Sequence, residues 1–316
     1  LATNKSTRDL FAGKLTWRIN DSQSLVASFL GDPEKLTGAV KPALGPVDTY
    51  TGINKTGGTD LSLRYEVTGT DWFAQAQMSR HRETNSILPE GPGANVVQLT
   101  DNTPIDPLNN PFGPGAVSGG FGRFDEKDFI RDTFAASFSK VLGPHEFKVG
   151  LDFQSDKADT RRGLSGGQSV VKKVNPNDSL RPVYQHFWWT TPDASLPDAP
   201  SITFTSKPKH ESRAYFAQDK WTLTSGLTVN LGVRLDETKV IDPQGITRIH
   251  LKDQWAPRLG IVWDWMGKGQ DKFYLSLSRF YEQVPLDLVI RSFSAERNPT
   301  IYNYSPTSMT PDPAAD

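Results

Sequence analysis

The sequence predicts an all-β fold built from antiparallel hairpins, and three observations support this prediction. Apolar and polar residues alternate along ten segments, which is the period of a β-strand whose two faces meet different surroundings. Short turns rich in Gly, Asp, Ser and Pro join these segments in pairs. No stretch shows the spacing of an amphipathic helix, so we expect no helix.

The ten predicted strands form five hairpins. In chain order they are 8–20 with 24–31 across an Asp-Ser-Gln turn, 59–68 with 72–83 across Gly-Thr-Asp, 131–140 with 146–154 across Leu-Gly-Pro, 212–222 with 227–238 across Thr-Ser-Gly, and 254–264 with 271–282 near Gly-Lys-Gly. The alternation is clearest in residues 227–238, where Leu231 and Val233 face away from Arg234 and Asp236.

The connections between hairpins are long, in contrast to the turns within them. Long segments rich in Pro, Gly, Asn and Asp lie near 32–58, 84–130, 155–211, 239–253 and 283–316. Loops above roughly 12–15 residues are uncommon in compact soluble domains unless they have a function. Since the tight turns and the long segments alternate five times, the long segments should lie together at one end of the hairpins.

This alternation indicates an antiparallel up-and-down β-barrel that spans a membrane. Such barrels have strands of roughly 9–11 residues, apolar outside and polar inside, with short turns at one end and long loops at the other. A polar inner face would explain the mean hydropathy of −0.49. Aromatic residues near predicted strand ends are typical of interfacial girdles: Trp17, Tyr65, Trp72, Trp221, Trp263 and Trp265. The alternative is a large soluble β-sandwich or propeller, whose strands also alternate.

Composition excludes several classes of protein and site. The chain of 316 residues has no cysteine, which excludes disulfides, thiolate metal sites and cysteine nucleophiles. Its net charge of −1 gives no reason to expect nucleic acid as a partner. No apolar run approaches the roughly 18 residues of a membrane helix.

The ends of the chain predict a single partial barrel domain over residues 1–316. If the tight turns face the periplasm, both chain ends lie on the external side. The last residues, 310–316, read Thr-Pro-Asp-Pro-Ala-Ala-Asp and are unsuited to a closing strand. We therefore expect about ten strands of a larger barrel, with at least one further strand on each side.

Residues 214–236 resemble a hairpin of TonB-dependent outer-membrane receptors. They read AYFAQDKWTLTSGLTVNLGVRLD, similar to that family's aromatic-x-Gln-Asp-x-Trp strand followed by Leu-Thr-x-Asn-x-Gly-x-Arg. Residues 255–260, WAPRLG, resemble the Pro-Arg-x-Gly pattern of the following strand. The stretches 278–285 and 296–299 look closer to the Oar-like subgroup, whereas residues 1–211 match only in pattern.

The resemblance implies a location and a set of partners. It implies a 22-strand barrel in the bacterial outer membrane, surrounded by lipid and lipopolysaccharide. A plug that this chain does not contain would fill the barrel and contact the TonB complex. The cargo would be a bulky extracellular nutrient such as a siderophore, glycan or peptide, taken up with energy from the inner membrane. The alternative is a β-rich surface-binding, adhesion or scaffold protein without transport activity.

Two sets of residues are candidates for binding. The third long segment contains an aromatic cluster that is suited to stacking on a sugar, siderophore or peptide: Tyr184, His186, Phe187, Trp188 and Trp189. The same cluster would equally serve to pack the loop or to touch lipid head groups. We expect a polar ladder on the inner wall of the barrel from Arg64, Glu66, Arg234 and Asp236.

We predict no catalytic residue, no metal site and no cofactor, and hence no enzyme. The five histidines are far apart and form no His-x-x-x-His pair. The chain contains neither the Asp-x-Asp spacing nor the Asp-His dipeptide that an outer-membrane protease would need. The basic pairs at 161–162 and 172–173 are suited to lipopolysaccharide phosphates or an anionic cargo, although such pairs are commonly just solvated.

Overall fold

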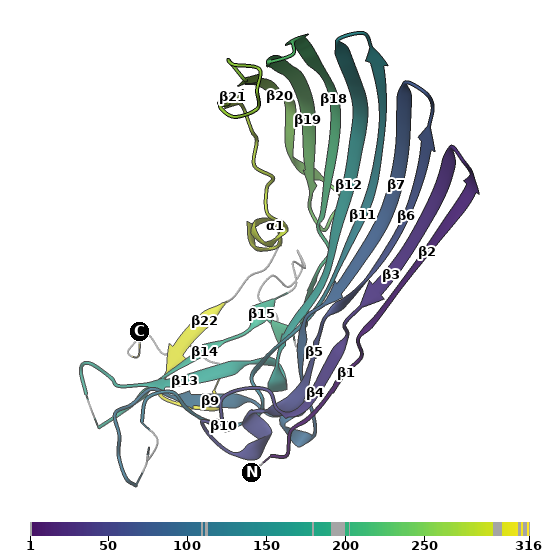
Figure 1. Cartoon of the computed structure of the whole chain (residues 1–316). Coiled ribbons are helices and arrows are strands. Elements are labelled where there is room, and N and C mark those ends of the chain that lie inside the picture. Colours follow the sequence, from purple (N-terminus) through teal and green to yellow (C-terminus); the bar gives the residue numbers. More distant parts are fainter. Residues whose placement is uncertain are drawn as a thin grey trace.

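A computed structural model shows how these segments are arranged. It describes residues 2–108, 110, 113–178, 180–190, 200–201, 203–292, 299–308, 311 and 315. Within these ranges most residues are in strands, and the strands form one large curved sheet with a smaller sheet beside one of its ends (Figure 1).

Ten strands of the large sheet form an antiparallel meander. They are β2 (Phe11–Asn20), β3 (Gln23–Gly31), β6 (Gly58–Thr68), β7 (Trp72–Thr84), β11 (Arg123–Leu142), β12 (His145–Leu164), β18 (Lys209–Thr224), β19 (Leu227–Ile241), β20 (Thr247–Trp263) and β21 (Phe273–Ser278). Each strand pairs with the one before and the one after it in this series. The five predicted hairpins and the all-β, antiparallel class are confirmed.

Several meander strands are longer than their alternation predicted. β11 and β12 each have 20 residues and pair over their whole length, from Arg123 with Leu164 to Leu142 with His145. Their outer halves lie in the segments 84–130 and 155–211, which the sequence analysis treated as loops. The hairpins therefore extend well past the apolar part of the sheet.

Further short strands prolong the large sheet beyond the hairpins. They are β1 (Lys5–Arg8), β4 (Glu34–Ala39), β5 (Thr51–Thr56), β8 (Ser86–Pro89) and β17 (Thr203–Ser206). The first four pair in the order β1-β4-β5-β8, and β8 then joins β11. The polypeptide kinks where β3 leads into β4 and where β5 leads into β6, at Pro33 and Gly57, and Gly57 has a positive φ of 89°.

The remaining elements form a layer at the same end, which we call the loop layer. Its five-stranded sheet has the order β10 (Ala116–Gly119), β9 (Gln98–Asp101), β13 (Ser169–Lys173), β14 (Val183–Phe187) and β22 (Thr300–Asn303). The other elements of the loop layer are β15 (Trp189–Thr190), β16 (Pro200–Ser201) and the 3₁₀ turns η1 (Val47–Thr49), η2 (Pro92–Asn95) and η3 (Ser165–Gly167). β9 and β13 pair in parallel although about 70 residues of chain separate them.

The two faces of the meander differ in chemistry. Directly paired residues share a face, so the observed registers carry each face across all ten strands. One face is apolar and open to its surroundings, with exposed fractions of 68% at Leu15, 50% at Val149 and 59% at Leu277. The opposite face carries mainly Ser, Thr, Gln, Asn and charged residues. A large exposed apolar surface of this kind is typical of a protein that contacts lipid.

Aromatic side chains gather on the apolar face near the tight turns. Trp72 stacks with Phe138 at 6.0 Å between ring centroids, and Trp221 stacks with His145 at 5.2 Å. Trp263 lies 6.0 Å from the ring of Phe273. These positions agree with the predicted interfacial girdle.

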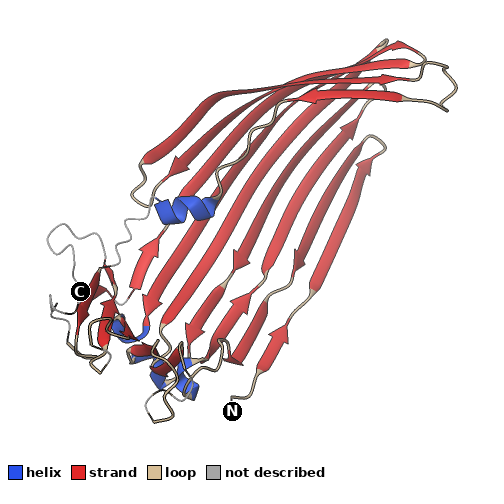
Figure 2. Cartoon of the chain, turned by 90° about the vertical axis from the view of Figure 1, so that its left-hand side faces the viewer, coloured by secondary structure: helices blue, strands red, loops and turns tan. Residues whose placement is uncertain are grey.

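A short helix, α1 (Leu286–Ser292), lies over the polar face, where it contacts β12 (Figure 2). The expectation that the chain has no helix was therefore wrong. With 7 residues, α1 makes only about two turns, which is too short for a helical period to appear in the sequence. Within the described ranges, no helix has the length and apolar character needed to cross a membrane.

Candidate functional site

The predicted polar residues lie on the polar face as two separate pairs. Arg64 Nε is 3.0 Å from Glu66 Oε1 on β6. On β19, Arg234 Nε donates to both carboxylate oxygens of Asp236, at 2.9 and 3.1 Å. Four strands lie between β6 and β19, so the pairs do not contact each other. Arg234 Nη2 is also 3.6 Å from Asp152 Oδ2 on β12, so the second pair extends across the wall, but the two sets do not join into one continuous ladder.

A continuous polar row does cross the same face, but it consists of other residues. It runs over β6, β7, β11, β12 and β18 through directly paired positions: Asp60, His81, Arg131, Asp156 and His210. We call this set the charge row. Sequence analysis missed it because its members are far apart along the chain. Two of its contacts could have been found from the sequence, because each lies within one hairpin. Residues at equal distances from the tight turn pair with each other, which places Arg131 opposite Asp156 and Asp60 opposite His81.

Asp156 is the centre of the charge row. Its carboxylate accepts hydrogen bonds from Arg131 Nε at 2.7 Å and from Gln154 Nε2 at 2.7 Å, and it contacts His210 Nδ1 at 3.1 Å. The charge row lies beyond the band of apolar residues on the opposite face, which we call the apolar belt and which ends near Phe153 on β12. Burial raises the pKa of Asp156, but the hydrogen bonds from His210, Arg131 and Gln154 outweigh it and lower the pKa to about 2. Asp156 is therefore ionised at neutral pH.

A cavity of about 360 Å³ lies over the charge row. Residues 283–286, just before and at the start of α1, form its opposite wall. His210 is 2% exposed, and its Nε2 atom has no hydrogen-bond partner in the described part of the chain. The guanidinium of Arg131 is 57% exposed. The cavity thus presents the cationic donor of Arg131 beside the buried imidazole of His210, and the carboxylate of Asp156 contacts both.

The predicted aromatic cluster lies inside the loop layer. His186 is fully buried: its Nε2 contacts Asn303 Oδ1 at 3.2 Å and Ser305 O at 2.9 Å. Trp188 and Trp189 are 6% and 4% exposed, and Trp189 packs with Leu164 and Phe204. The other two members, Tyr184 and Phe187, are half-buried. In this arrangement the cluster packs the loop layer; cargo contact by its partly exposed members stays a prediction.

Two titratable groups form hydrogen bonds at the end of the sheet where the loop layer lies. Lys41 donates from Nζ to the carbonyls of Phe121 at 2.7 Å and Arg123 at 2.5 Å. Burial lowers the pKa of Lys41 to about 8, against the opposing effect of Asp125.

The second group, Asp242, is buried in the turn between β19 and β20. It accepts hydrogen bonds from Ile246 N at 2.8 Å, Arg248 Nε at 2.6 Å and Gln244 N at 3.0 Å. Burial raises the pKa of Asp242, but these hydrogen bonds outweigh burial and hold it below its usual range.

Comparison with known proteins adds an independent line of evidence. Residues 1–247 match the family described as outer membrane beta barrel domain. The chain is also 25% identical, over an alignment of 339 positions, to the TonB-dependent transporter Oar of Myxococcus xanthus. This match covers 90% of this chain and 32% of that protein.

Solved structures show the same fold. FpvA of P. aeruginosa, in a complex with a heterologous pyoverdine and iron, has a TM-score of 0.55 at 11% identity, covering 86% of this chain and 35% of FpvA. The outer membrane transporter YddB of Escherichia coli has a TM-score of 0.53 at 12% identity, covering 92% of this chain and 34% of YddB. The chain spans about a third of the length of each of these relatives.

Proposed function

The chain belongs to the outer membrane beta barrel domain family, and from this premise we propose that it forms part of the wall of a TonB-energised transporter. The transporter would take up a bulky nutrient such as a siderophore, glycan or peptide. Family membership places the chain in the bacterial outer membrane, as the sequence predicted. Its relatives are named as transporters and a pyoverdine-binding receptor, which agrees with the prediction that it is not an enzyme.

The observation that carries the proposal is the division of the meander into an apolar and a polar face. In a membrane every strand must pair with neighbours, and a closed barrel is the arrangement that achieves this with strands. The apolar face would contact lipid, so the polar face would line the lumen. A wall with carboxylate, guanidinium and imidazole side chains across five neighbouring strands is suited to a wet interior that holds polar protein or cargo.

The charge row is the part of the wall that we propose contacts a plug or a passing cargo. Its cavity already accommodates a piece of polypeptide, residues 283–286, against the wall. The exposed side chain of Arg131 is a group that a second polar surface would engage. A plug that fits here would have to leave or rearrange before a bulky cargo passed.

Growth of a deletion strain tests transport. The strain, with and without the full-length gene restored, is given ferric siderophores, oligosaccharides or peptides as the sole source of iron, carbon or nitrogen. Energised transport predicts that one class supports growth only when the gene is present, and that an inner-membrane uncoupler abolishes accumulation of the labelled nutrient. Equal growth on every nutrient would refute the proposal.

The second candidate is surface binding without transport, and the loop layer favours it. This layer has its own five-stranded sheet and buried side chains such as His186, so it presents a folded surface beyond the barrel. In that case removal of the gene would reduce attachment to surfaces or to other cells. Nutrient accumulation would then be the same with and without the gene, and insensitive to the uncoupler.

A further inference from the structure

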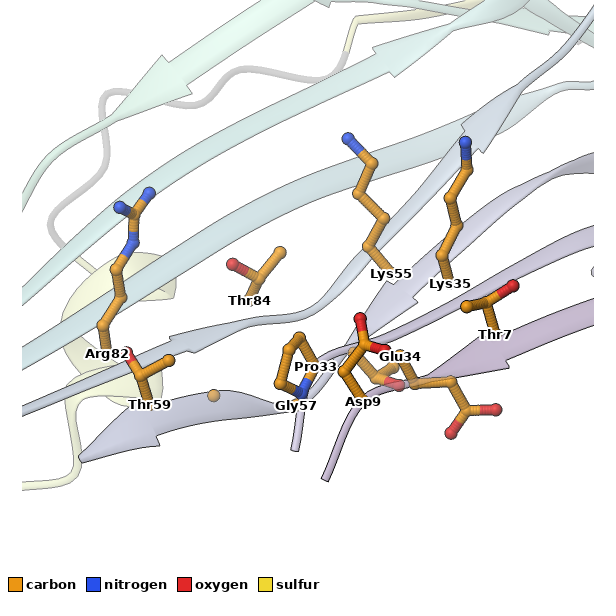
Figure 3. A pocket seen from close by; sticks show the side chains of 12 residues that line it. Thr7, Asp9, Pro33, Glu34, Lys35, Lys55, Gly57, Thr59, Arg82 and Thr84 are labelled. Carbon is orange, nitrogen blue, oxygen red and sulfur yellow. The ribbon is translucent and has the colours of Figure 1, made fainter. Parts of the chain in front are cut away.

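A groove of about 550 Å³ lies where the meander passes into its short outer strands (Figure 3). Gly57 and Pro33 lie at its base, where β5 meets β6 and β3 meets β4. Thr59 and Arg82, paired across β6 and β7, form one wall. Both share a face with Leu61 and Met78, which belong to the apolar belt. The groove therefore opens on the lipid side, at the external end of that belt.

Two lysines face each other in this groove. Lys35 on β4 and Lys55 on β5 are directly paired positions, and their side chains extend side by side (Figure 3). Both side chains are exposed, and neither has an ion pair with any described residue. Like charges directly opposite on neighbouring strands destabilise a sheet. An anion between the two ammonium groups would remove this repulsion.

Arg82 adds a third positive charge to the groove. Its Nη2 is 3.1 Å from Asp128 Oδ2, and its side chain is 58% exposed, so the guanidinium keeps N–H donors beyond the one that faces Asp128. Of the two carboxylates that line the groove, Glu34 accepts a hydrogen bond from Ser6 at 2.8 Å. Three cationic side chains and two carboxylates line the groove, and Asp128 beside Arg82 is a third carboxylate, so the positive charges without an acidic partner among the described residues are those of Lys35 and Lys55. The hydroxyls of Thr7 and Thr59 provide additional donors.

Three of the four residues in the basic pairs 161–162 and 172–173 differ from Lys35 and Lys55 because they have acidic partners. Lys172 is 2.8 Å from Asp101, and Arg161 is 3.4 Å from Glu126. Arg162 is 3.2 Å from Asp125, with a side chain only 10% exposed. The fourth residue of these pairs, Lys173, has its Nζ 5.7 Å from the ring centroid of Tyr302. Lys35 and Lys55 remain available to an external anion.

We propose that the groove of Lys35, Lys55 and Arg82 binds a phosphate group of a phosphorylated glycolipid in the outer leaflet. Phosphate oxygens accept hydrogen bonds from ammonium and guanidinium groups and carry the charge that these groups require. The groove lies where head groups meet acyl chains, so one molecule can place its phosphate in the groove and its chains along Leu61 and Met78. This location favours a lipid over a soluble anion. The proposal rests on the outer-membrane location and not on transport.

Binding of lipid A to the purified full-length protein in detergent tests this proposal. Fluorescent, doubly phosphorylated lipid A and its dephosphorylated form are titrated separately, followed by inorganic phosphate as competitor. The test variant is Lys35→Gln/Lys55→Gln. The matched control is Lys14→Gln/Lys148→Gln, which removes two positive charges from the polar face. Heat-modifiable migration on a gel verifies that each variant is folded.

The proposal predicts that the test variant binds phosphorylated lipid A about 30-fold more weakly, since each lysine near a lipid surface contributes roughly a factor of five. The control variant and the dephosphorylated lipid should show no such change. Unchanged affinity in the test variant, or an equal loss with dephosphorylated lipid A or in the control variant, would overturn the proposal. Displacement of the lipid by micromolar inorganic phosphate would assign the groove to a soluble anion instead.

Discussion

Ala135 and Ala136 provide a direct test of which face of the wall contacts lipid. They are neighbours on β11, so their side chains lie on opposite faces. Ala136 pairs with Leu151 and Ala76 on the apolar face, about midway between the girdle near Trp72 and the charged Asp132. Ala135 pairs with Asp152 and Gln77 on the polar face. The same substitution at the two positions therefore differs only in the face that receives it.

We expect Ala136→Arg to destabilise the folded protein by about 2–4 kcal/mol, the effect of arginine at the middle of a bilayer on a lipid-facing strand. This corresponds to a loss of about 30-fold to 700-fold in the folding equilibrium constant. At Ala135 the new guanidinium would meet water, Gln77 and the carboxylate of Asp152. We expect Ala135→Arg to change the free energy of unfolding by no more than about 1 kcal/mol.

The measurement is urea-induced unfolding of the full-length protein in phospholipid vesicles, followed by tryptophan fluorescence. The fraction of each variant that inserts, taken from heat-modifiable gel migration, gives a second measure if Ala136→Arg fails to fold. Equal destabilisation by the two variants, or a larger effect at Ala135, would show that the faces are assigned wrongly.

Three further predictions concern the end of the sheet where the loop layer lies. The pKa of Lys41 is about 8 in the folded protein and near 10.4 in the unfolded chain, so between these pH values the unfolded chain binds more protons than the folded protein. The free energy of unfolding should therefore rise with pH across this window, seen as stronger amide protection in the loop layer after correction for intrinsic exchange. Lys41→Met should abolish that rise, and a rise that persists would contradict the assignment. His186→Ala removes the hydrogen bonds of a fully buried imidazole with Asn303 and Ser305 and should cost about 1–3 kcal/mol, seen as faster proteolysis near residues 300–308. Tyr184→Ala on the same strand is the control, and an equal effect there would argue against burial as the cause. Because the pKa of Asp242 is lowered, its ionised carboxylate stabilises the β19–β20 turn at neutral pH, and this effect is lost as the pH falls below the usual aspartate range. Asp242→Asn should therefore increase amide exchange in this turn already at neutral pH. Unchanged exchange in the variant would contradict this.

The hairpins of the meander could be predicted because each depends on local sequence. Alternation defines the two faces of a strand, and a tight turn sets the register of its partner. The observed hairpins β2–β3 and β18–β19 therefore lie close to the predicted segments 8–31 and 212–238. The resemblance of residues 214–236 to TonB-dependent receptors was confirmed by the family match and by the similarity to Oar.

The loop layer could not be predicted, since its contacts join distant parts of the chain. The parallel pairing of β9 with β13 places Leu99 next to Val170, and no local sequence pattern predicts this pairing. The outer halves of β11 and β12 escaped notice for another reason. Beyond Asp132 polar and charged residues occupy both faces, and the apolar Phe129 and Ile130 lie on opposite faces, so the alternation ends although the pairing continues.

The candidate site shows the same division between local and distant contacts. The ion pairs Arg64–Glu66 and Arg234–Asp236 each lie within one strand, two residues apart, and were recognisable from the sequence. The charge row was not, because the adjacency of His81 and Arg131 depends on the register between two hairpins. A long connection separates these two hairpins, so the sequence does not determine which residues of β7 and β11 pair with each other.

The two faces of β11 indicate where the membrane ends. On the apolar face, Phe134 is followed by Asp132, whose carboxylate pairs with Arg80 at 2.6 Å. On the polar face, the charge row begins one residue further along, at Arg131. The polar face also carries charged side chains below this height, such as Lys148 and Asp152 on β12, so the Asp132–Arg80 pair marks a change of surroundings on the apolar face only. A bilayer boundary at this height explains that change. The lysine groove, formed by strands beyond this height, then lies among lipid head groups.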